Sequence, residues 1–234
     1  MNNRFLAILV TAALAIAATA PKSYQVKWIG ALHKVMGGED KAAISLDSFS
    51  SVPNFYALGP MAGLNGEITV FNSEPSISTI QDGKPIVQKT FHVEAPLLIY
   101  VQVAKWSETP IPASVRTLAD LEKFVAARAR KAGIDMNEPF PFRVIAHCDD
   151  VAMHIVNRQG REIKGHEDHA KIQVKIPIAG ADMEFLGFWS DRQQIVLTHM
   201  GSNAHVHGRT ADGKLSGHVD EVHLRPGKLF LPVD

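Results

Sequence analysis

Three histidines near the end of the chain have the spacing of a metal site. His205 and His207 are separated by one residue, and ten residues separate this pair from His218. On a β-strand, alternate side chains point to the same face about 6–7 Å apart, so both rings of the pair can reach one ion. The dipeptide Asp212-Gly213 lies between the pair and His218 and predicts a tight hairpin. A hairpin would return His218 to the side of the first two rings, and we therefore predict a metal centre there.

Three imidazoles from two neighbouring strands leave positions open on a metal ion, which is typical of catalytic zinc. Zinc is the predicted cofactor, although three imidazoles also suit manganese, iron and nickel. The alternative is that these histidines are polar residues on an exposed strand face. Cys148 is the only cysteine, so an intrachain disulfide is excluded. A lone cysteine is more often a small buried apolar residue than a ligand or nucleophile.

The other histidines have weaker spacing arguments. His199 precedes the cluster and is a candidate for the same pocket, with a surface position at a strand end as the alternative. His166 and His169 lie in a polar segment that resembles a solvated loop. The default for the remaining histidines is a satisfied core or surface position; they are His33, His92, His147, His154 and His223.

Glu67 is the most interesting carboxylate, because a metal site needs an acid or base beside its ligands. It follows the glycine-rich turn 63–66 and begins a predicted strand. At the mouth of a strand its side chain can reach a pocket, whereas the alternative is an ordinary surface acid.

The elements that must position these residues are mostly strands. One helix is predicted, with Thr117 and Asp120 as a capping box and Gly133 just after its end. A Pro-containing segment at 135–141 marks a boundary between two parts, 21–135 and 136–234. Branched and aromatic residues predict strands throughout the second part, which suggests a curled sheet or small barrel; these strands cover 142–146, 151–156, 171–178, 184–189, 194–199, 204–209 and 217–224.

Composition and the N-terminus restrict partners and location. The 234 residues are 46% hydrophobic, and 24 basic residues balance 24 acidic ones, so nucleic acid is not an expected partner. Residues 1–20 combine Arg4, an apolar run and small residues, which predicts a secretory signal peptide and a periplasmic or secreted protein. The apolar run is shorter than the roughly 20 residues of a membrane span, so a retained anchor is the weaker reading and no membrane association is expected after signal removal.

Three segments together resemble the α-acetolactate decarboxylase family: 63–68, 187–190, and the three histidines with their spacing. The resemblance implies an α+β fold in two parts, with a mixed N-terminal sheet and a β-rich, barrel-like C-terminal half that carries zinc on His205, His207 and His218. It implies that Glu67 is the active-site glutamate. It also implies an active-site arginine, for which Arg158 is the candidate with Asn157 adjacent, and a homodimer formed through the N-terminal sheet.

The resemblance predicts the decarboxylation of a 2-hydroxy-3-oxo acid such as 2-acetolactate, giving acetoin and CO2. In the family a second glutamate comes from the C-terminal tail, and here only Glu221 or Asp234 could replace it. The alternative is therefore a metal-binding protein on the same scaffold that has lost or changed its catalysis and takes a different small molecule. A cupin-type oxygenase is disfavoured, because residues 208–213 lack the glutamate that usually follows its histidine pair.

Overall fold

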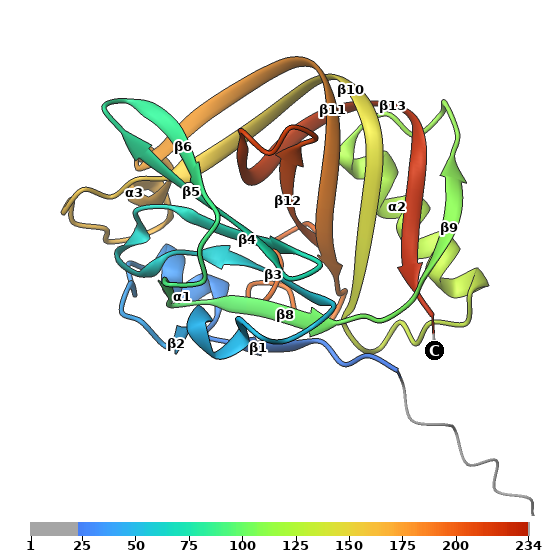
Figure 1. Cartoon of the computed structure of the whole chain (residues 1–234), viewed down its shortest axis with the longest axis horizontal. Coiled ribbons are helices and arrows are strands. Elements are labelled where there is room, and N and C mark those ends of the chain that lie inside the picture. Colours follow the sequence, from blue (N-terminus) through green and yellow to red (C-terminus); the bar gives the residue numbers. More distant parts are fainter. Residues whose placement is uncertain (1–22, 234) are drawn as a thin grey trace, which may run out of the picture.

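A computed structural model describes residues 23–233 of the chain, and antiparallel sheets form most of it (Figure 1). The predicted signal peptide and Asp234 lie outside the described residues. The mainly β architecture with few helices confirms the predicted α+β class. None of the helices in the described part is both long and apolar enough to cross a bilayer.

The first sheet has six strands and carries Glu67. In spatial order these strands are β1 (Lys27–Ile29), β8 (Leu98–Gln102), β3 (Phe55–Pro60), β4 (Glu67–Phe71), β5 (Glu74–Gln81) and β6 (Lys84–Gln88). All of β4 is buried, and its side chains alternate between two environments. Ile68 and Val70 join a small core on one face, while Glu67 and Thr69 are buried polar residues on the other. This polar face of β4 is the one that reaches the predicted site.

The second sheet carries the three histidines. It contains β10 (Phe140–Val156), β11 (Gln173–Trp189), β12 (Ala204–Thr210), β13 (Ser216–Pro232) and β9 (Trp106–Ile111). Neighbours pair antiparallel in that order, and β10 also pairs with β13, so four strands form a circuit of pairings. The sheet is therefore strongly curled, and its long strands rise beside the first sheet in Figure 1. Strand β9 precedes the predicted boundary but pairs with β13 along its length.

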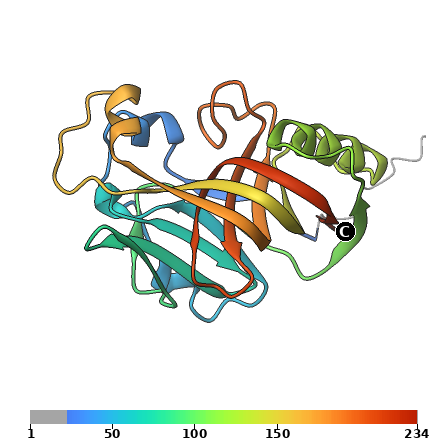
Figure 2. The same cartoon turned by 90° about the horizontal axis from the view of Figure 1, so that it is seen from above.

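Helices cover parts of this framework (Figure 2). Helix α2 (Leu118–Lys131) begins at the predicted capping box of Thr117 and Asp120, and Gly133 follows its end with φ of 76°. Its buried residues Leu121 and Val125 join the main core. The remaining elements are short: α1 (Leu32–Met36), α3 (His166–Lys171), the strand pair β2 (Ile44–Ser45) and β7 (Glu94–Ala95), and two 3₁₀ turns at Leu46–Phe49 and Ala62–Leu64.

A charged cluster joins the two sheets away from the histidines. Glu184 of β11 forms ion pairs with Arg143 of β10 and, at 2.7 Å, with Arg209 of β12. The guanidinium of Arg143 lies over the ring of Tyr56, and that of Arg209 lies 4.4 Å from the centre of Phe71. Tyr56 and Phe71 belong to the first sheet. Glu184 thus neutralises two arginines whose guanidinium groups contact aromatic rings of the first sheet.

We expect Glu184→Gln to lower the free energy of unfolding by about 3 kcal/mol, because two largely buried guanidinium groups lose this carboxylate and Arg209 keeps only the exposed Glu74 at 3.5 Å. Urea unfolding would measure the change. The matched control is Glu108→Gln, which removes an exposed pair with Lys228 and should cost no more than about 0.5 kcal/mol. Equal costs for the two substitutions would contradict the structural role of Glu184.

Cys148 lies in β10 with no exposed surface, as expected for a small buried residue. Burial, with smaller contributions from Asp149, Asp182 and Asp150, raises the pKa of its thiol to about 12. The reactive form is the thiolate, so the folded protein should not react with a disulfide reagent between pH 7 and 9. Reaction is expected only after unfolding in urea, and rapid labelling of the native protein at pH 8 would refute this.

Candidate metal centre

The hairpin between β12 and β13 brings the three predicted histidines together. His207 and His218 are directly paired across the two strands, and His205 lies two residues before His207 on the same face. The turn is the predicted one, with Gly213 at φ of 69°. The three ring centres lie 5.0–5.4 Å apart. Sequence spacing and turn type were sufficient to place these rings side by side.

Hydrogen bonds orient two of the rings. The Nδ1 atom of His205 donates to the carbonyl oxygen of Leu197 at 2.8 Å, so its Nε2 atom carries a lone pair, which faces Nδ1 of His218. The Nδ1 atom of His207 lies 3.0 Å from the hydroxyl of Thr69, which in turn accepts a hydrogen bond from Ser216 at 3.3 Å. Such contacts are typical of the groups that orient metal-bound histidines.

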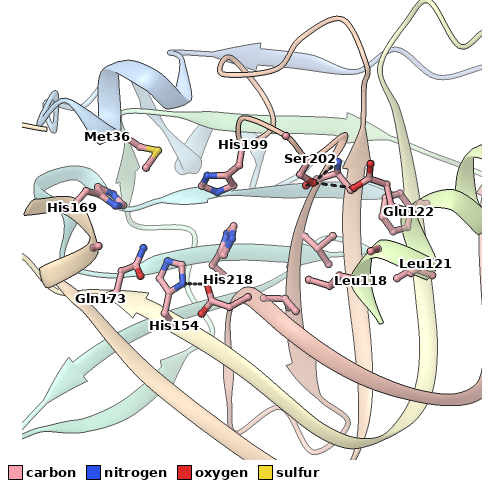
Figure 3. A pocket seen from close by; sticks show the side chains of 18 residues that line it. Met36, Leu118, Leu121, Glu122, His154, His169, Gln173, His199, Ser202 and His218 are labelled. Carbon is pink, nitrogen blue, oxygen red and sulfur yellow. Dashed lines mark hydrogen bonds and ion pairs between the residues drawn. The ribbon is translucent and has the colours of Figure 1, made fainter. Parts of the chain in front are cut away.

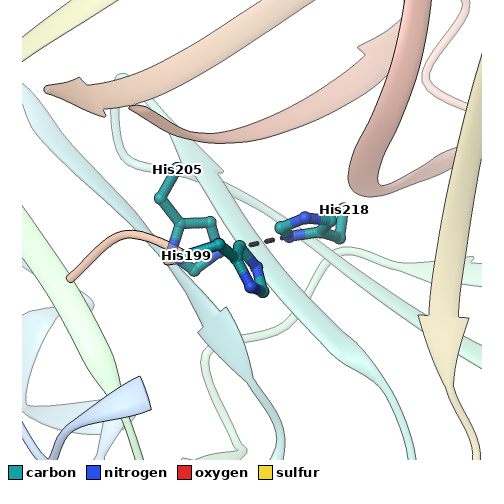
Figure 4. Close-up of side chains that lie close together, drawn as sticks. All are labelled: His199, His205 and His218. Carbon is teal, nitrogen blue, oxygen red and sulfur yellow. Dashed lines mark hydrogen bonds between the residues drawn. The ribbon is translucent and has the colours of Figure 1, made fainter. Parts of the chain in front are cut away.

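The donor atoms fit a metal ion. The Nδ1 atom of His218 lies 3.2 Å from the Nε2 atom of His205. Nitrogen ligands at 2.0–2.1 Å in tetrahedral geometry are separated by roughly 3.3 Å, so one zinc ion could take both lone pairs. Ring nitrogens of His199, His205 and His218 all lie within 4.8 Å of one another (Figure 4). His199 therefore belongs to the converging group, whereas the predicted ligand His207 contributes to it only through the proximity of its ring.

The imidazoles are neutral, as metal binding requires. Burial, and to a smaller extent the neighbouring His199 and His154, lower the pKa of His205 to about 3 despite the hydrogen bond to Leu197. Burial also holds the pKa values of His207 and His218 well below the ordinary value for histidine. At neutral pH all three rings can offer a lone pair without first losing a proton.

Glu67 lies beside this cluster, at the start of β4. One carboxylate oxygen lies 3.8 Å from Nε2 of His207, and the other accepts the backbone N–H of Val156 at 3.3 Å. The side chain is 3% exposed, and burial raises its pKa well above the ordinary value despite that hydrogen bond. The preceding residue, Gly66, packs closely against Met61, because a Cβ at position 66 would lie 2.5 Å from the sulfur of Met61.

Arg158 lies just beyond the end of β10, near the turn that precedes Glu67. Its backbone N–H donates to the carbonyl of Leu64 at 2.8 Å. Its guanidinium, however, forms an ion pair with Asp40 and donates from Nε to the carbonyl of Arg161 at 2.6 Å. The structure thus places Arg158 at the same edge as Glu67 but already paired with a carboxylate.

Sequence reasoning missed a histidine–aspartate pair at the centre. His154 of β10 is paired with His218 in register, and their ring centres are 4.6 Å apart. The register of β13 against β10 shifts by one residue at Asp220. This bulge lets Asp220 accept a hydrogen bond from Nδ1 of His154 at 2.8 Å and one from Lys175 at 3.1 Å. Burial alone would raise the pKa of Asp220, but these two contacts outweigh it and lower the pKa.

A cavity of about 450 Å³ opens beside the histidines (Figure 3). His154, His199 and His218 line one part of it, and Leu118 and Leu121 of α2 line another. Further lining residues are Met36, Glu122, Phe142, His169, Gln173, Ser202, Val206, Val219 and Asp220. The cavity therefore has a polar end at the candidate ligands and an apolar end at the helix.

Two local predictions near this cavity are wrong. His169 does not lie in a solvated loop, because residues 166–171 form α3 and bury its side chain against the cavity. Residues 194–199 are not a regular strand, because Ile195 has a positive φ and the chain turns there to form a loop.

Glu221, one of the two predicted replacements for the second glutamate of the family, does not line the cavity. Glu221 is exposed, on the surface beside Asp150 and His223. Asp234 lies outside the described residues. The neighbouring Asp220 is the acid that β13 contributes, and its position depends on the bulge, which has no signal in the sequence.

Comparisons with known proteins agree with this architecture. A family model described as alpha-acetolactate decarboxylase matches residues 24–232. The acetolactate decarboxylase of Bacillus subtilis strain 168 superposes with a TM-score of 0.74 at 15% identity, covering 90% of this chain and 86% of that one. A Staphylococcus aureus protein of unknown function, similar to alpha-acetolactate decarboxylase, gives a TM-score of 0.69 at 13% identity, covering 88% and 84%. No curated protein sequence matches the chain. At these identities the solved structures establish a shared fold.

Proposed function

Because the chain belongs to the alpha-acetolactate decarboxylase family, we propose that it is a zinc-dependent decarboxylase. Its substrate would be a 2-hydroxy-3-oxo acid such as 2-acetolactate, and its products acetoin and CO2. The observation that carries this proposal is the cluster of three neutral imidazoles, with the buried carboxyl of Glu67 3.8 Å from one of them. The arrangement supplies both a metal site and a proton-transfer group side by side.

The residues that would hold zinc are His205, His207 and His218. When bound, zinc would supply a positive charge that polarises the hydroxyl and ketone oxygens of the substrate. The protein orients the rings through Leu197 and Thr69, so little reorganisation is needed when the ion binds.

Glu67 is assigned the proton transfer. When the bond to the carboxylate breaks, its electron pair stays on the substrate carbon, and a proton must then be added at that carbon. Glu67 lies beside the candidate ligand His207 and is shielded from solvent. A proton delivered from this side chain would replace the lost CO2.

Arg158 keeps its assignment as the group that holds the departing carboxylate. A guanidinium has five N–H donors, and the contacts with Asp40 and Arg161 use two of them. The remaining donors could bind a substrate carboxylate while Asp40 fixes the side chain. Within this proposal, Asp40 positions Arg158.

A second candidate is a metal-binding protein that has lost or changed its catalysis. The ion pair between Arg158 and Asp40 favours it, because a paired arginine attracts a substrate carboxylate less strongly. Such a protein would take a different small molecule in the same cavity. We also propose export to the periplasm or medium, from the predicted signal peptide, and assembly as a homodimer, from the family resemblance.

Elemental analysis and acetoin release from 2-acetolactate, measured on the same samples, test the main proposal. We expect about one zinc per chain, as for a mononuclear catalytic site. Activity should disappear after treatment with a chelator and return with zinc. Zinc without acetoin would support the second candidate, and a protein that binds no metal would refute both.

A further inference from the structure

The loop 190–203 brings a fourth histidine to the candidate metal centre. Its ends are joined by a hydrogen bond from the N–H of Ser190 to the carbonyl of Asn203 at 2.8 Å. Leu197 and Thr198 within the loop are fully buried. His199 follows them directly and points toward His205 and His218 (Figure 4).

His199 lies at ligand-like distances from two of the three predicted ligands, His205 and His218. Its ring centre lies 5.7 Å from His205 and 5.2 Å from His218, compared with 5.0–5.4 Å among the three predicted ligands. One ligand nitrogen of His199 and those of His205 and His218 all lie within 4.8 Å of one another, a group that does not include His207. We infer that His199 is a fourth protein ligand of the same metal ion. The inference rests on the metal centre that underlies the proposed function.

Several contacts hold the loop in this position. Glu122 of α2 accepts hydrogen bonds from the hydroxyl of Ser202 and the N–H of Asn203, both at 3.0 Å (Figure 3). The carbonyl of Leu197 orients the ring of His205. The loop that carries His199 thus also positions an adjacent ligand, so the two rings are placed together.

A set of four imidazoles changes the resting state of the centre. Three protein ligands leave a coordination position open, whereas four complete a tetrahedral zinc site. A substrate must then displace His199 or enlarge the coordination number. A compound that offers two oxygens, such as a 2-hydroxy ketone, can compensate for the lost imidazole better than one with a single donor. The adjoining Met200 is 83% exposed, and His199 itself lines the cavity, so a substrate there could reach it.

Cobalt(II) substitution tests the ligand assignment independently of activity. Cobalt in the wild-type protein should show the intense visible bands of a four-coordinate ion. In His199→Ala a water would replace the imidazole, so the visible bands should shift and become pH-dependent, with metal affinity at least about tenfold lower. His169→Ala is the matched control, because His169 lines the same cavity from α3 and lies outside the group of converging nitrogens. It should leave the cobalt spectrum unchanged.

A cysteine at the same position makes the test decisive. His199→Cys should add a thiolate-to-cobalt charge-transfer band in the near ultraviolet, since native Cys148 is buried in β10. Cobalt binding without that band, together with an unchanged spectrum for His199→Ala, would overturn the fourth ligand and leave the proposed decarboxylase intact. A wild-type protein that binds no cobalt or zinc would overturn both.

Discussion

His207→Ala is expected to lower zinc affinity by more than about 100-fold, which exceeds the usual effect of removing a group that only orients a ligand. His207 is 1% exposed and lies between Thr69 and Glu67, so no solvent-facing group can take its place. Acetoin release should disappear with the metal. Competition with a chromophoric chelator and elemental analysis would measure the loss.

The matched control for this substitution is His223→Ala. His223 lies on β13 beyond His218, is half exposed and pairs with Asp150. Its removal should leave zinc content and acetoin release unchanged. Full zinc occupancy in His207→Ala would contradict the ligand assignment, and equal loss in both variants would indicate general destabilisation of the sheet.

Glu67→Gln is expected to reduce kcat by about 10²- to 10⁴-fold, the range for loss of a general acid or base. The amide has nearly the same shape, and its oxygen can still accept the N–H of Val156. Zinc content and KM should therefore change little. Steady-state kinetics on zinc-loaded protein would separate these effects.

The control for Glu67 is Glu74→Gln, at the start of the neighbouring strand β5, where the carboxylate is 70% exposed. We expect kcat within about twofold of the wild-type value, as for most exposed substitutions. If Glu67→Gln retained full kcat, the proton would have to come from another group. If it also lost zinc, the role of Glu67 would be to support the metal site.

The local features of the site were accessible from the sequence. A histidine pair with one residue between them fixes a shared strand face, and Asp212-Gly213 specifies the hairpin that returns His218. The capping box at Thr117 also acts within a few residues, and it was confirmed. The family resemblance, carried by the same histidines and the turn before Glu67, was confirmed by the family match.

The features that were missed depend on contacts between distant segments. The pairing of His154 with His218 requires the register of two 17-residue strands, and the position of Asp220 requires a bulge within one of them. The partner of Arg158 is Asp40, far away in the chain. The predicted strand at 194–199 was apolar enough, but the positive φ of Ile195 depends on the loop as a whole.

His218 is paired with His207 of β12 on one side and with His154 of β10 on the other. This double pairing affects where the chain can accept an insertion. A one-residue slip in an ordinary hairpin would turn His218 to the opposite face. Here β13 is held by β10 over most of its length, independently of the turn at 211–215. An insertion in that turn should therefore be absorbed as a longer exposed loop, and the site would tolerate a peptide tag or label there.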